Sequence, residues 1–245
     1  MFIEKLLQLM AEKKASDIFL SSGSPIMIKI QGVMMPVNPT VMDAEQTKKI
    51  VYEMLTPAQI ATFEKDLELN LSKPMPGIGN FRVNVFWQKG SIASVIRFIT
   101  AEIPKLEDLN LPPVLLQLVM EKRGLVLVVG ATGSGKSTTL ASMLDFRNQM
   151  VANHILTIED PIEYVFTPKK CVFNQREVGN DTHAFHDALR NAMRQAPDCI
   201  LIGEIRDQET MRMALTYALS GHLCLATLHA NNSYQAMNRV ISFFP

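Results

Sequence analysis

The chain has 245 residues, 47% hydrophobic and 20% charged, so it can bury one large core or two smaller ones. Its 24 basic and 24 acidic residues cancel, which argues against a protein drawn by bulk charge to nucleic acid or to an anionic membrane. The cysteines form no C-x-x-C pair, and no apolar run reaches the roughly 18 residues of a membrane span. Cys199 and Cys224 lie in apolar runs and are predicted to be buried, a usage typical of a reducing cytoplasm.

The first hundred residues mix short helices with short strands. Hydrophobic spacing predicts, in chain order, a helix over 2–10, strands over 17–20 and 26–30, helices over 46–55 and from Pro57, and paired strands over 81–86 and 94–99. We expect Asp43 or Thr40 to cap the second helix, and Thr56 to precede the third. Helices mixed with antiparallel strands predict a small α+β domain over residues 1–100.

Strands and helices then alternate, as is typical of a parallel α/β sheet. A linker region with a short helix is predicted over 101–122. The closely spaced prolines over 102–113 make its first part stiff and unsuited to either core, and a short helix from Val114 to Lys122 leads into the next strand. The core over 123–245 is predicted to contain strands over 124–129, 154–158, 199–202 and 223–228, and helices capped by Thr182, Asp207 and Ser233.

The last two helices are amphipathic. The inward face of the helix after Asp207 is predicted to hold Met211, Ala214, Leu215, Ala218 and Leu219, with Gly221 at its end. The inward face of the final helix is predicted to hold Ala236, Met237, Val240, Ile241 and Phe244. We expect Phe243 to point elsewhere and Pro245 to terminate the helix.

One stretch matches the phosphate-loop pattern G-x-x-x-x-G-K-[ST] at every fixed position: Gly130-Ala131-Thr132-Gly133-Ser134-Gly135-Lys136-Ser137. Average residue usage makes a chance match roughly a 1% event. A β-branched apolar run precedes the stretch and helical spacing follows it, as the motif requires. With Thr138, residues 131–137 are therefore predicted to bind a nucleoside triphosphate, with Lys136 on the β- and γ-phosphates and Ser137 on Mg²⁺.

Acidic residues follow two of the other predicted strands. Ligands of open parallel sheets bind beyond the carboxyl ends of the strands, where Glu204 is expected to direct a Mg²⁺ ion and Asp198, at the other end of its strand, is not. Three carboxylates follow the strand over 154–158: Glu159, Asp160 and Glu163. One of them is expected to orient or deprotonate an attacking water. The alternatives are a helix N-terminal charge at Glu204 and an acidic loop without a catalytic role.

The strand over 223–228 has a histidine at each end. His229 is the candidate sensor of the γ-phosphate, and His222 is separated from it by roughly 20 Å of extended chain. Both side chains cannot touch the same phosphate within one subunit. Taken alone, His222 is more typical of a capping or interface histidine.

Four segments together resemble the characteristic boxes of the secretion ATPase superfamily: residues 130–137, 158–163, 200–207 and 221–229. Within it the chain resembles the type IV pilus retraction ATPases, the PilT and PilU family, and residues 121–124 favour the PilU branch. Ala15-Ser16-Asp17 and residues 174–178 fit the same family, so the resemblance covers nearly the whole chain.

The resemblance implies roles for individual residues. It places Lys136 and Ser137 in Walker A, makes Glu204 an atypical Walker B acid and metal residue, and makes Glu163 the catalytic glutamate. It puts His222 and His229 in a histidine box. It also implies that two arginines of the N-terminal domain, Arg82 and Arg97, lie near nucleotide, although unaligned they look like solvated strand residues.

The resemblance also implies a fold and an assembly. The expected fold is α/β, a RecA-like P-loop ATPase core joined to a smaller α+β, PAS-like N-terminal domain. The expected protein is an ATP- and Mg²⁺-dependent hexameric motor for pilus retraction and twitching motility, working as a homo-hexamer or in a mixed ring with a paralogous ATPase. It is expected to be cytoplasmic and peripheral at the inner membrane, on the cytoplasmic face of the pilus platform protein, with no nucleic-acid partner.

Two departures from the family pattern shape these expectations. Phe19 stands where many relatives have histidine, which bears on the N-terminal domain and not on ATP chemistry. We expect this chain to fold and bind ATP, because every phosphate-contacting segment is complete. Relatives continue past Pro245 into a helical region, so we also expect the 245-residue chain to form rings weakly and to hydrolyse ATP slowly.

Other functions remain open. A type II secretion or pilus assembly ATPase is one alternative, although those relatives usually carry a tetracysteine zinc motif. A non-hydrolysing accessory subunit is disfavoured by the presence of Lys136, Glu163 and Glu204. A nucleic-acid-translocating motor is disfavoured by the zero net charge.

Overall fold

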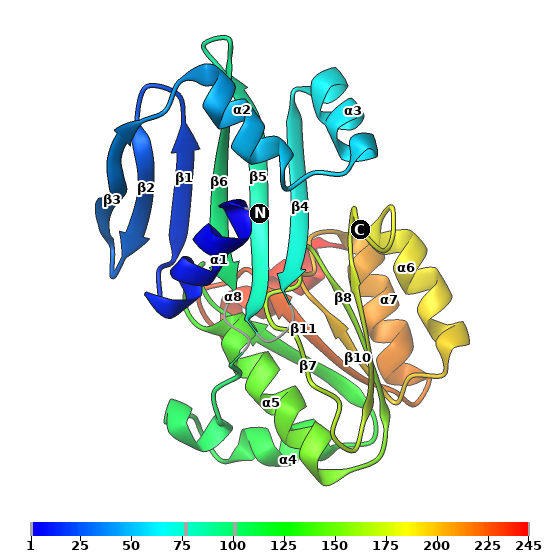
Figure 1. The fold of residues 1–245 in the computed structure, drawn as a ribbon. Helices are drawn as coiled ribbons and strands as arrows, with labels where there is room; N and C mark the ends of the chain where they lie inside the picture. The colour runs from blue at the N-terminus through cyan, green and yellow to red at the C-terminus, as the bar shows by residue number, and fades with distance from the viewer. Residues whose placement is uncertain (1, 76–77, 100–101, 245) are drawn as a thin grey trace. The chain divides into compact units, whose positions relative to one another are not determined.

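The computed structural model describes residues 2–75, 78–99 and 102–244. The chain separates into two compact units, Met1–Ala101 and Glu102–Pro245 (Figure 1). The domain boundary predicted at residues 100–101 and the predicted terminator Pro245 lie outside the described residues. None of the helices in the described ranges is long and apolar enough to cross a membrane.

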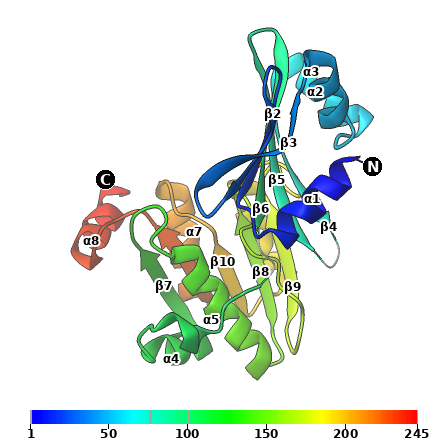
Figure 2. The same cartoon turned by 60° about the vertical axis from the view of Figure 1, so that its left-hand side comes forward.

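The first unit is an antiparallel sheet with helices packed on one face (Figure 2). Its elements are α1 (Phe2–Glu12), β1 (Asp17–Ser21), β2 (Pro25–Ile30), β3 (Val33–Val41), α2 (Ala44–Tyr52), α3 (Pro57–Asp66), β4 (Glu68–Met75), β5 (Gly79–Gln88) and β6 (Ser91–Ile99). The strand order is β3-β2-β1-β6-β5-β4. The predicted α+β architecture is confirmed.

Alternate apolar side chains along the strands form the core of this unit. Phe81, Val83 and Val85 are fully buried, as their spacing predicts, and they belong to the same hydrophobic cluster as the apolar face of α1. Asp43 caps α2 and Thr56 caps α3, each through a capping box with the residue three positions on. Local sequence thus determines where these elements begin.

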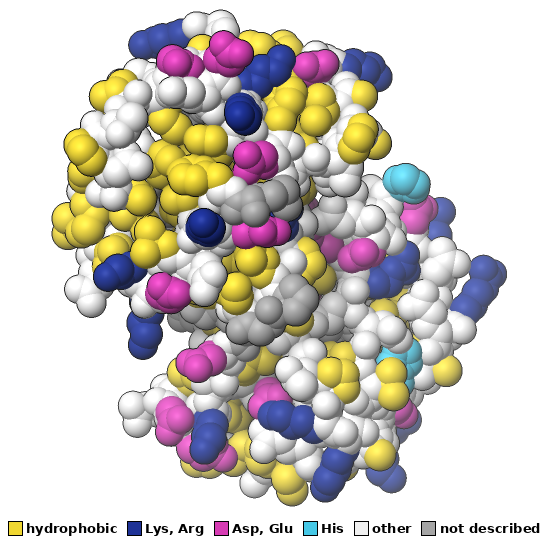
Figure 3. Space-filling view, viewed as in Figure 1, with side chains coloured by type: hydrophobic (Ala, Val, Ile, Leu, Met, Phe, Trp, Pro, Cys, Tyr) yellow, Lys and Arg dark blue, Asp and Glu magenta, His cyan; other side chains and the backbone are white. Residues whose placement is uncertain are grey.

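Strands β3 and β4 are not anticipated by the sequence. Most residues of β3 are exposed, and its Val33, Met34, Met35 and Val41 are between 39% and 59% exposed. Figure 3 shows hydrophobic side chains gathered over β1, β2 and β3 on the side of the molecule that faces the viewer. Both are edge strands, held by backbone pairing to a single neighbour. In β3 most residues are exposed, and in β4 the alternation is confined to Leu69 and Leu71 between polar residues.

The second unit is a parallel five-stranded sheet between two layers of helices. Its elements are η1 (Leu106–Leu109), α4 (Val114–Met120), β7 (Gly124–Val129), α5 (Lys136–Met150), β8 (His154–Glu159), β9 (Val172–Glu177), α6 (Phe185–Ala192), η2 (Met193–Gln195), β10 (Cys199–Ile202), α7 (Gln208–Leu219), β11 (Leu223–Leu228) and α8 (Ser233–Ser242). The strand order is β7-β11-β10-β8-β9, with every pair parallel. The predicted α/β core is confirmed.

Successive residues of the central strands enter two different cores. Leu156, Ile200 and Cys224 pack with α6 and α7, while Ile155 and Leu201 pack with α4 and α5. Figure 2 shows α5 and α7 on opposite faces of the sheet. Both faces are therefore buried, which is why these strands are continuous apolar runs.

The segment predicted to be a linker packs into this core. Leu106 is 5% exposed and Val119 is fully buried, and both contact the cluster that surrounds α5. Their apolar side chains outweigh the stiffness of the neighbouring prolines. The expectation that the proline-containing stretch is unsuited to either core is therefore wrong for Leu106, whereas the short helix with Val119 lies where it was predicted.

The starts of α6 and α8 differ from prediction. Thr182 does not cap α6; it bridges to Val178 in a turn, and Ala184 occupies the N-cap position. Asn232, and not Ser233, caps α8, because its side chain accepts a hydrogen bond from the backbone N–H of Gln235. Neighbouring capping residues compete, and the turn geometry decides between them.

The predicted inward faces of α7 and α8 are confirmed in part. Met211, Ala214 and Ala236 are buried, and Leu215, Val240 and Phe244 pack on the core, but other positions differ. On α7, Tyr217 is fully buried and donates a hydrogen bond to the Leu189 carbonyl, whereas Leu219 is 83% exposed. On α8, Met237 and Ile241 are 60% and 65% exposed, while Phe243 packs on the core. Several apolar faces are possible on such short helices, and tertiary packing selects one.

Candidate functional site

The carboxyl ends of four neighbouring strands bring the predicted boxes together. The phosphate loop follows β7, His229 follows β11, Glu204 follows β10, and the loop with Glu163 follows β8. These strands are adjacent in the order β7-β11-β10-β8. Because all are parallel, their carboxyl ends share one edge of the sheet, where such folds bind ligands.

The phosphate loop has the backbone that an anion cradle needs. Gly133 and Gly135 have φ of +77° and +91°, which disfavour other residues. A Cβ on Gly130 would collide with the Ser134 hydroxyl. α5 begins directly after Gly135, so the loop leads into the N-terminus of a 15-residue helix.

The ammonium of Lys136 and the hydroxyls of Ser137 and Thr138 are also suited to bind a phosphate group together with a metal cation. The Lys136 Nζ donates to the carbonyl oxygens of Gly130 at 3.0 Å and Ala131 at 2.9 Å, so its ammonium lies over the loop. Ser137 stands in the first turn of α5, and the Thr138 hydroxyl is 2.9 Å from the Tyr164 hydroxyl of the acidic loop. The residues present therefore fit a nucleoside phosphate held by backbone N–H groups and Lys136.

Glu204 lies at the centre of a charged network that joins three strand ends. The Arg206 Nε donates to Glu204 Oε2 at 2.7 Å, and the His229 Nε2 lies 3.0 Å from Glu204 Oε1. The Arg206 Nη1 donates to Asp160 Oδ2 at 3.1 Å. The acid after β10 thus contacts the histidine after β11 directly and the acidic loop after β8 through an arginine.

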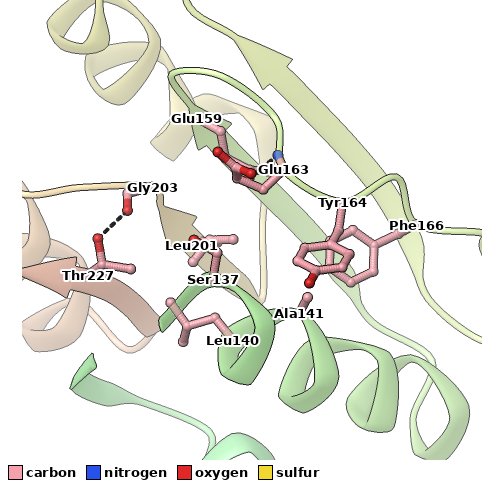
Figure 4. A pocket seen from close by; sticks show the side chains of 10 residues that line it. All are labelled: Ser137, Leu140, Ala141, Glu159, Glu163, Tyr164, Phe166, Leu201, Gly203 and Thr227. Atoms are coloured by element: carbon pink, nitrogen blue, oxygen red, sulfur yellow. Dashed lines mark hydrogen bonds between the residues drawn. The ribbon is translucent and has the colours of Figure 1, made fainter. Parts of the chain in front are cut away.

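Glu159 and Glu163 lie next to the start of α5 (Figure 4). They line a cavity of about 20 Å³ together with Ser137, Gly203 and Thr227. This volume is enough for one water molecule. A carboxylate, a hydroxyl and a water-sized space therefore meet where the acidic loop approaches the phosphate loop.

Glu159 is the most deeply buried acid of this group, at 7% exposure. Burial raises its pKa to about 7. Its Oε2 accepts a long hydrogen bond of 3.5 Å from the backbone N–H of Glu163, drawn in Figure 4. Gly203 permits the close approach, because a Cβ there would lie 3.1 Å from the Glu159 Cα.

His222 lies at the opposite edge of the sheet from His229. Its Nδ1 is 3.1 Å from the Ser220 hydroxyl, and its ring packs edge-on against Tyr217 at 6.3 Å. It lines a cavity of about 620 Å³ with Asp198 and Arg147. His222 therefore does not join the phosphate-side group within its own chain, as strand geometry predicts.

Arg82 and Arg97 lie in the first unit as cross-strand partners on β5 and β6. Asp17 on β1 is in turn the cross-strand partner of Arg97. Cross-strand partners project from the same face of a sheet, so the three charged side chains form one row. Both arginines belong to a different unit from the phosphate loop.

The structure adds Arg206, Tyr164 and Thr227 to the site residues selected from the sequence. Glu159 and Asp160, which the sequence already offered as candidate acids, line the small cavity and join the network around Glu204 respectively. A signal existed for the acids, since both lie at the carboxyl end of a strand. No spacing rule connects Arg206 to Asp160, which is 46 residues away.

Comparisons with known proteins agree with this geometry. The family model described as type II/IV secretion system protein matches residues 1–243. The whole chain is 50% identical to the type IV pilus ATPase PilU of Pseudomonas aeruginosa and spans 64% of that protein's length. It is 45% identical to the type IV pilus retraction ATPase PilT of the same organism and spans 71% of its length.

A solved structure agrees in fold. The crystal structure of the pilus retraction motor PilT with bound ADP superimposes with a TM-score of 0.95 at 44% identity, covering 99% of this chain and 71% of that one. The match to the family model extends over almost the entire chain and includes both units. The chain therefore belongs to the type II/IV secretion system protein family.

Proposed function

We propose that this chain is an ATP-hydrolysing motor subunit that powers type IV pilus retraction. The observation that carries the proposal is the meeting of Lys136, Ser137, Glu163, Glu204 and His229 at one edge of a parallel sheet. The full-length similarity to PilU and PilT supports retraction as the mechanical task.

Each residue has a separate task at this edge. The loop N–H groups and Lys136 bind the phosphates, and Ser137 with Glu204 would hold Mg²⁺, which neutralises the developing charge when bound. Glu163 orients the attacking water from the loop beside Ser137, and His229 senses the γ-phosphate while it contacts Glu204. Thr138 borders the loop through its bond to Tyr164.

We further propose that the motor works as a ring, a homo-hexamer or one mixed with a paralogous ATPase. The ring would lie on the cytoplasmic face of the inner-membrane platform protein of the pilus. Arg82, Arg97 and His222 are the candidates for action across subunits. The two arginines belong to a different unit from the phosphate loop, and His222 lies at the opposite edge of the sheet from His229. The N-terminal unit is proposed to be the PAS-like domain of this motor.

Phosphate release from ATP tests the enzymatic part of the proposal. Wild-type protein should release phosphate from ATP when Mg²⁺ is present and stop when the Mg²⁺ is chelated. Lys136→Gln should abolish turnover, because the ammonium that neutralises the phosphates is lost. Turnover that survives Lys136→Gln would contradict the assignment.

Complementation tests the mechanical part. The gene should restore twitching motility to a bacterial strain that lacks its retraction ATPases, and Lys136→Gln should not. Restoration of pilus assembly in an assembly-deficient strain, without any effect on retraction, would favour the assembly ATPase instead.

A further inference from the structure

Arg206 connects the acidic loop after β8 to the acid after β10. Its guanidinium stands between two carboxylates, with Nη1 3.1 Å from Asp160 Oδ2 and Nε 2.7 Å from Glu204 Oε2. An arginine side chain stays protonated in proteins. Arg206 therefore holds a permanent positive charge within hydrogen-bond distance of both carboxylates.

The Glu204 carboxylate has protein partners and is also the proposed ligand of Mg²⁺. One oxygen faces Arg206 and the other faces His229, so both oxygens already have partners. The proposed function assigns the same carboxylate to Mg²⁺. A cation bound there would lie close to the Arg206 guanidinium, and like charges that share one carboxylate repel each other.

The pairing with Asp160 adds a geometric constraint. Asp160 and Glu163 are three positions apart in the loop between β8 and β9, so a contact that fixes Asp160 also limits where Glu163 can lie. An arginine holds two carboxylates in defined directions because its donors are fixed in a plane, whereas a lysine acts as a point charge.

We propose that Arg206 is a positioning residue that fixes the Asp160 loop relative to Glu204 and competes with Mg²⁺ for the Glu204 carboxylate. The inference rests on the proposed function. It assigns Arg206 two separable effects, a favourable one on the geometry of hydrolysis and an unfavourable one on Mg²⁺ affinity. An arginine that only stabilised the fold would not lower Mg²⁺ affinity.

The test is a Mg²⁺ titration of equilibrium binding to a fluorescent ATP analogue that is not hydrolysed, together with ATP turnover. In Arg206→Gln the Mg²⁺ concentration at half-saturation should fall about two- to five-fold, the range expected for a partly exposed charge pair. Turnover should fall about tenfold or more, because the loop and Glu204 are no longer held together. In Arg206→Lys the Mg²⁺ requirement should stay within twofold of wild type while turnover still falls.

The structure offers a matched control and a partner variant. Arg190 pairs with Glu209 at 3.0 Å between α6 and α7, and Arg190→Gln should change neither readout. Asp160→Asn should lower turnover, and combining it with Arg206→Gln should lower turnover no further than Arg206→Gln alone.

An unchanged or raised Mg²⁺ requirement in folded Arg206→Gln overturns the inference. If that variant does not fold, normal turnover in Arg206→Lys or in Asp160→Asn overturns it instead. Failure of the wild-type chain to bind the analogue with Mg²⁺ would overturn the proposed function, and this inference with it. Normal wild-type binding with Arg206→Gln behaving like Arg190→Gln would overturn this inference alone.

Discussion

Asp17 and Arg97 form an ion pair across β1 and β6, with Arg97 Nε donating to Asp17 Oδ1 at 2.9 Å. The aspartate is 5% exposed and also accepts a hydrogen bond from the Ser16 hydroxyl at 2.8 Å. The arginine side chain is 60% exposed. A buried carboxylate therefore anchors one end of Arg97 while much of the side chain faces solvent, an arrangement suited to a residue that acts outside its own unit.

Arg97→Ala should lower stability and, in the proposed ring, ATP turnover. Losing the guanidinium leaves the buried Asp17 carboxylate short of a partner, which costs roughly 1–3 kcal/mol of unfolding free energy. Denaturant unfolding should show that adding Asp17→Asn recovers most of this loss. If Arg97 acts across subunits, turnover stays low in the double variant and ATP affinity of the monomer stays within twofold. Equal losses of monomer affinity and turnover would contradict the cross-subunit role.

Glu163→Gln should separate ATP binding from hydrolysis. The amide keeps the shape of the side chain but cannot accept a proton or orient water as strongly, so turnover should fall by about 10² or more. ATP affinity, measured by equilibrium binding, should stay within a few-fold because the phosphate loop is unchanged. Near-normal turnover would move the role to Glu159 or Asp160.

Glu159→Gln should raise stability at alkaline pH. The pKa of Glu159 is raised by burial from 4.5 to about 7, so the folded state prefers the protonated carboxyl. Below about pH 4.5 both states are protonated and wild type and variant should unfold alike. As pH rises towards 7 the unfolded state ionises first, and wild-type stability falls by roughly 3 kcal/mol relative to the variant.

Thermal unfolding at pH 4.5 and pH 8 measures this difference. Glu121→Gln, at an exposed glutamate, serves as the control and should show no such pH dependence. A Glu159→Gln variant that is less stable than wild type at pH 8 would show that the carboxylate is stabilised in the fold.

His222→Ala should affect the assembled ring and not the isolated site. The side chain lies at the amino edge of the sheet, beside Ser220 and Asp198, so nucleotide affinity of the monomer should not change. Turnover should fall only under conditions in which sedimentation shows rings. His229→Ala is the contrasting variant, because it removes a partner of Glu204 and should lower turnover in both forms.

Local sequence was sufficient for much of the fold. The phosphate loop and the capping boxes at Asp43 and Thr56 depend on interactions within a few residues, and local apolar runs mark β7, β8, β10 and β11. Each lies where its pattern predicts. The same patterns placed Glu204 and His229 at the carboxyl ends of their strands. A residue that directly follows a strand in the sequence must lie at the carboxyl end of that strand, so this placement needs no tertiary information.

Tertiary structure decided which strand ends are neighbours. Residue spacing does not reveal that β10 lies between β11 and β8, and this order is what lets Glu204 contact His229 on one side and reach Asp160 through Arg206 on the other. It also selected the buried faces of α7 and α8 and formed the edge strands β3, β4 and β9, which the sequence does not predict. These features depend on the free energies of contacts between residues far apart in the chain, which a local sequence pattern does not reveal.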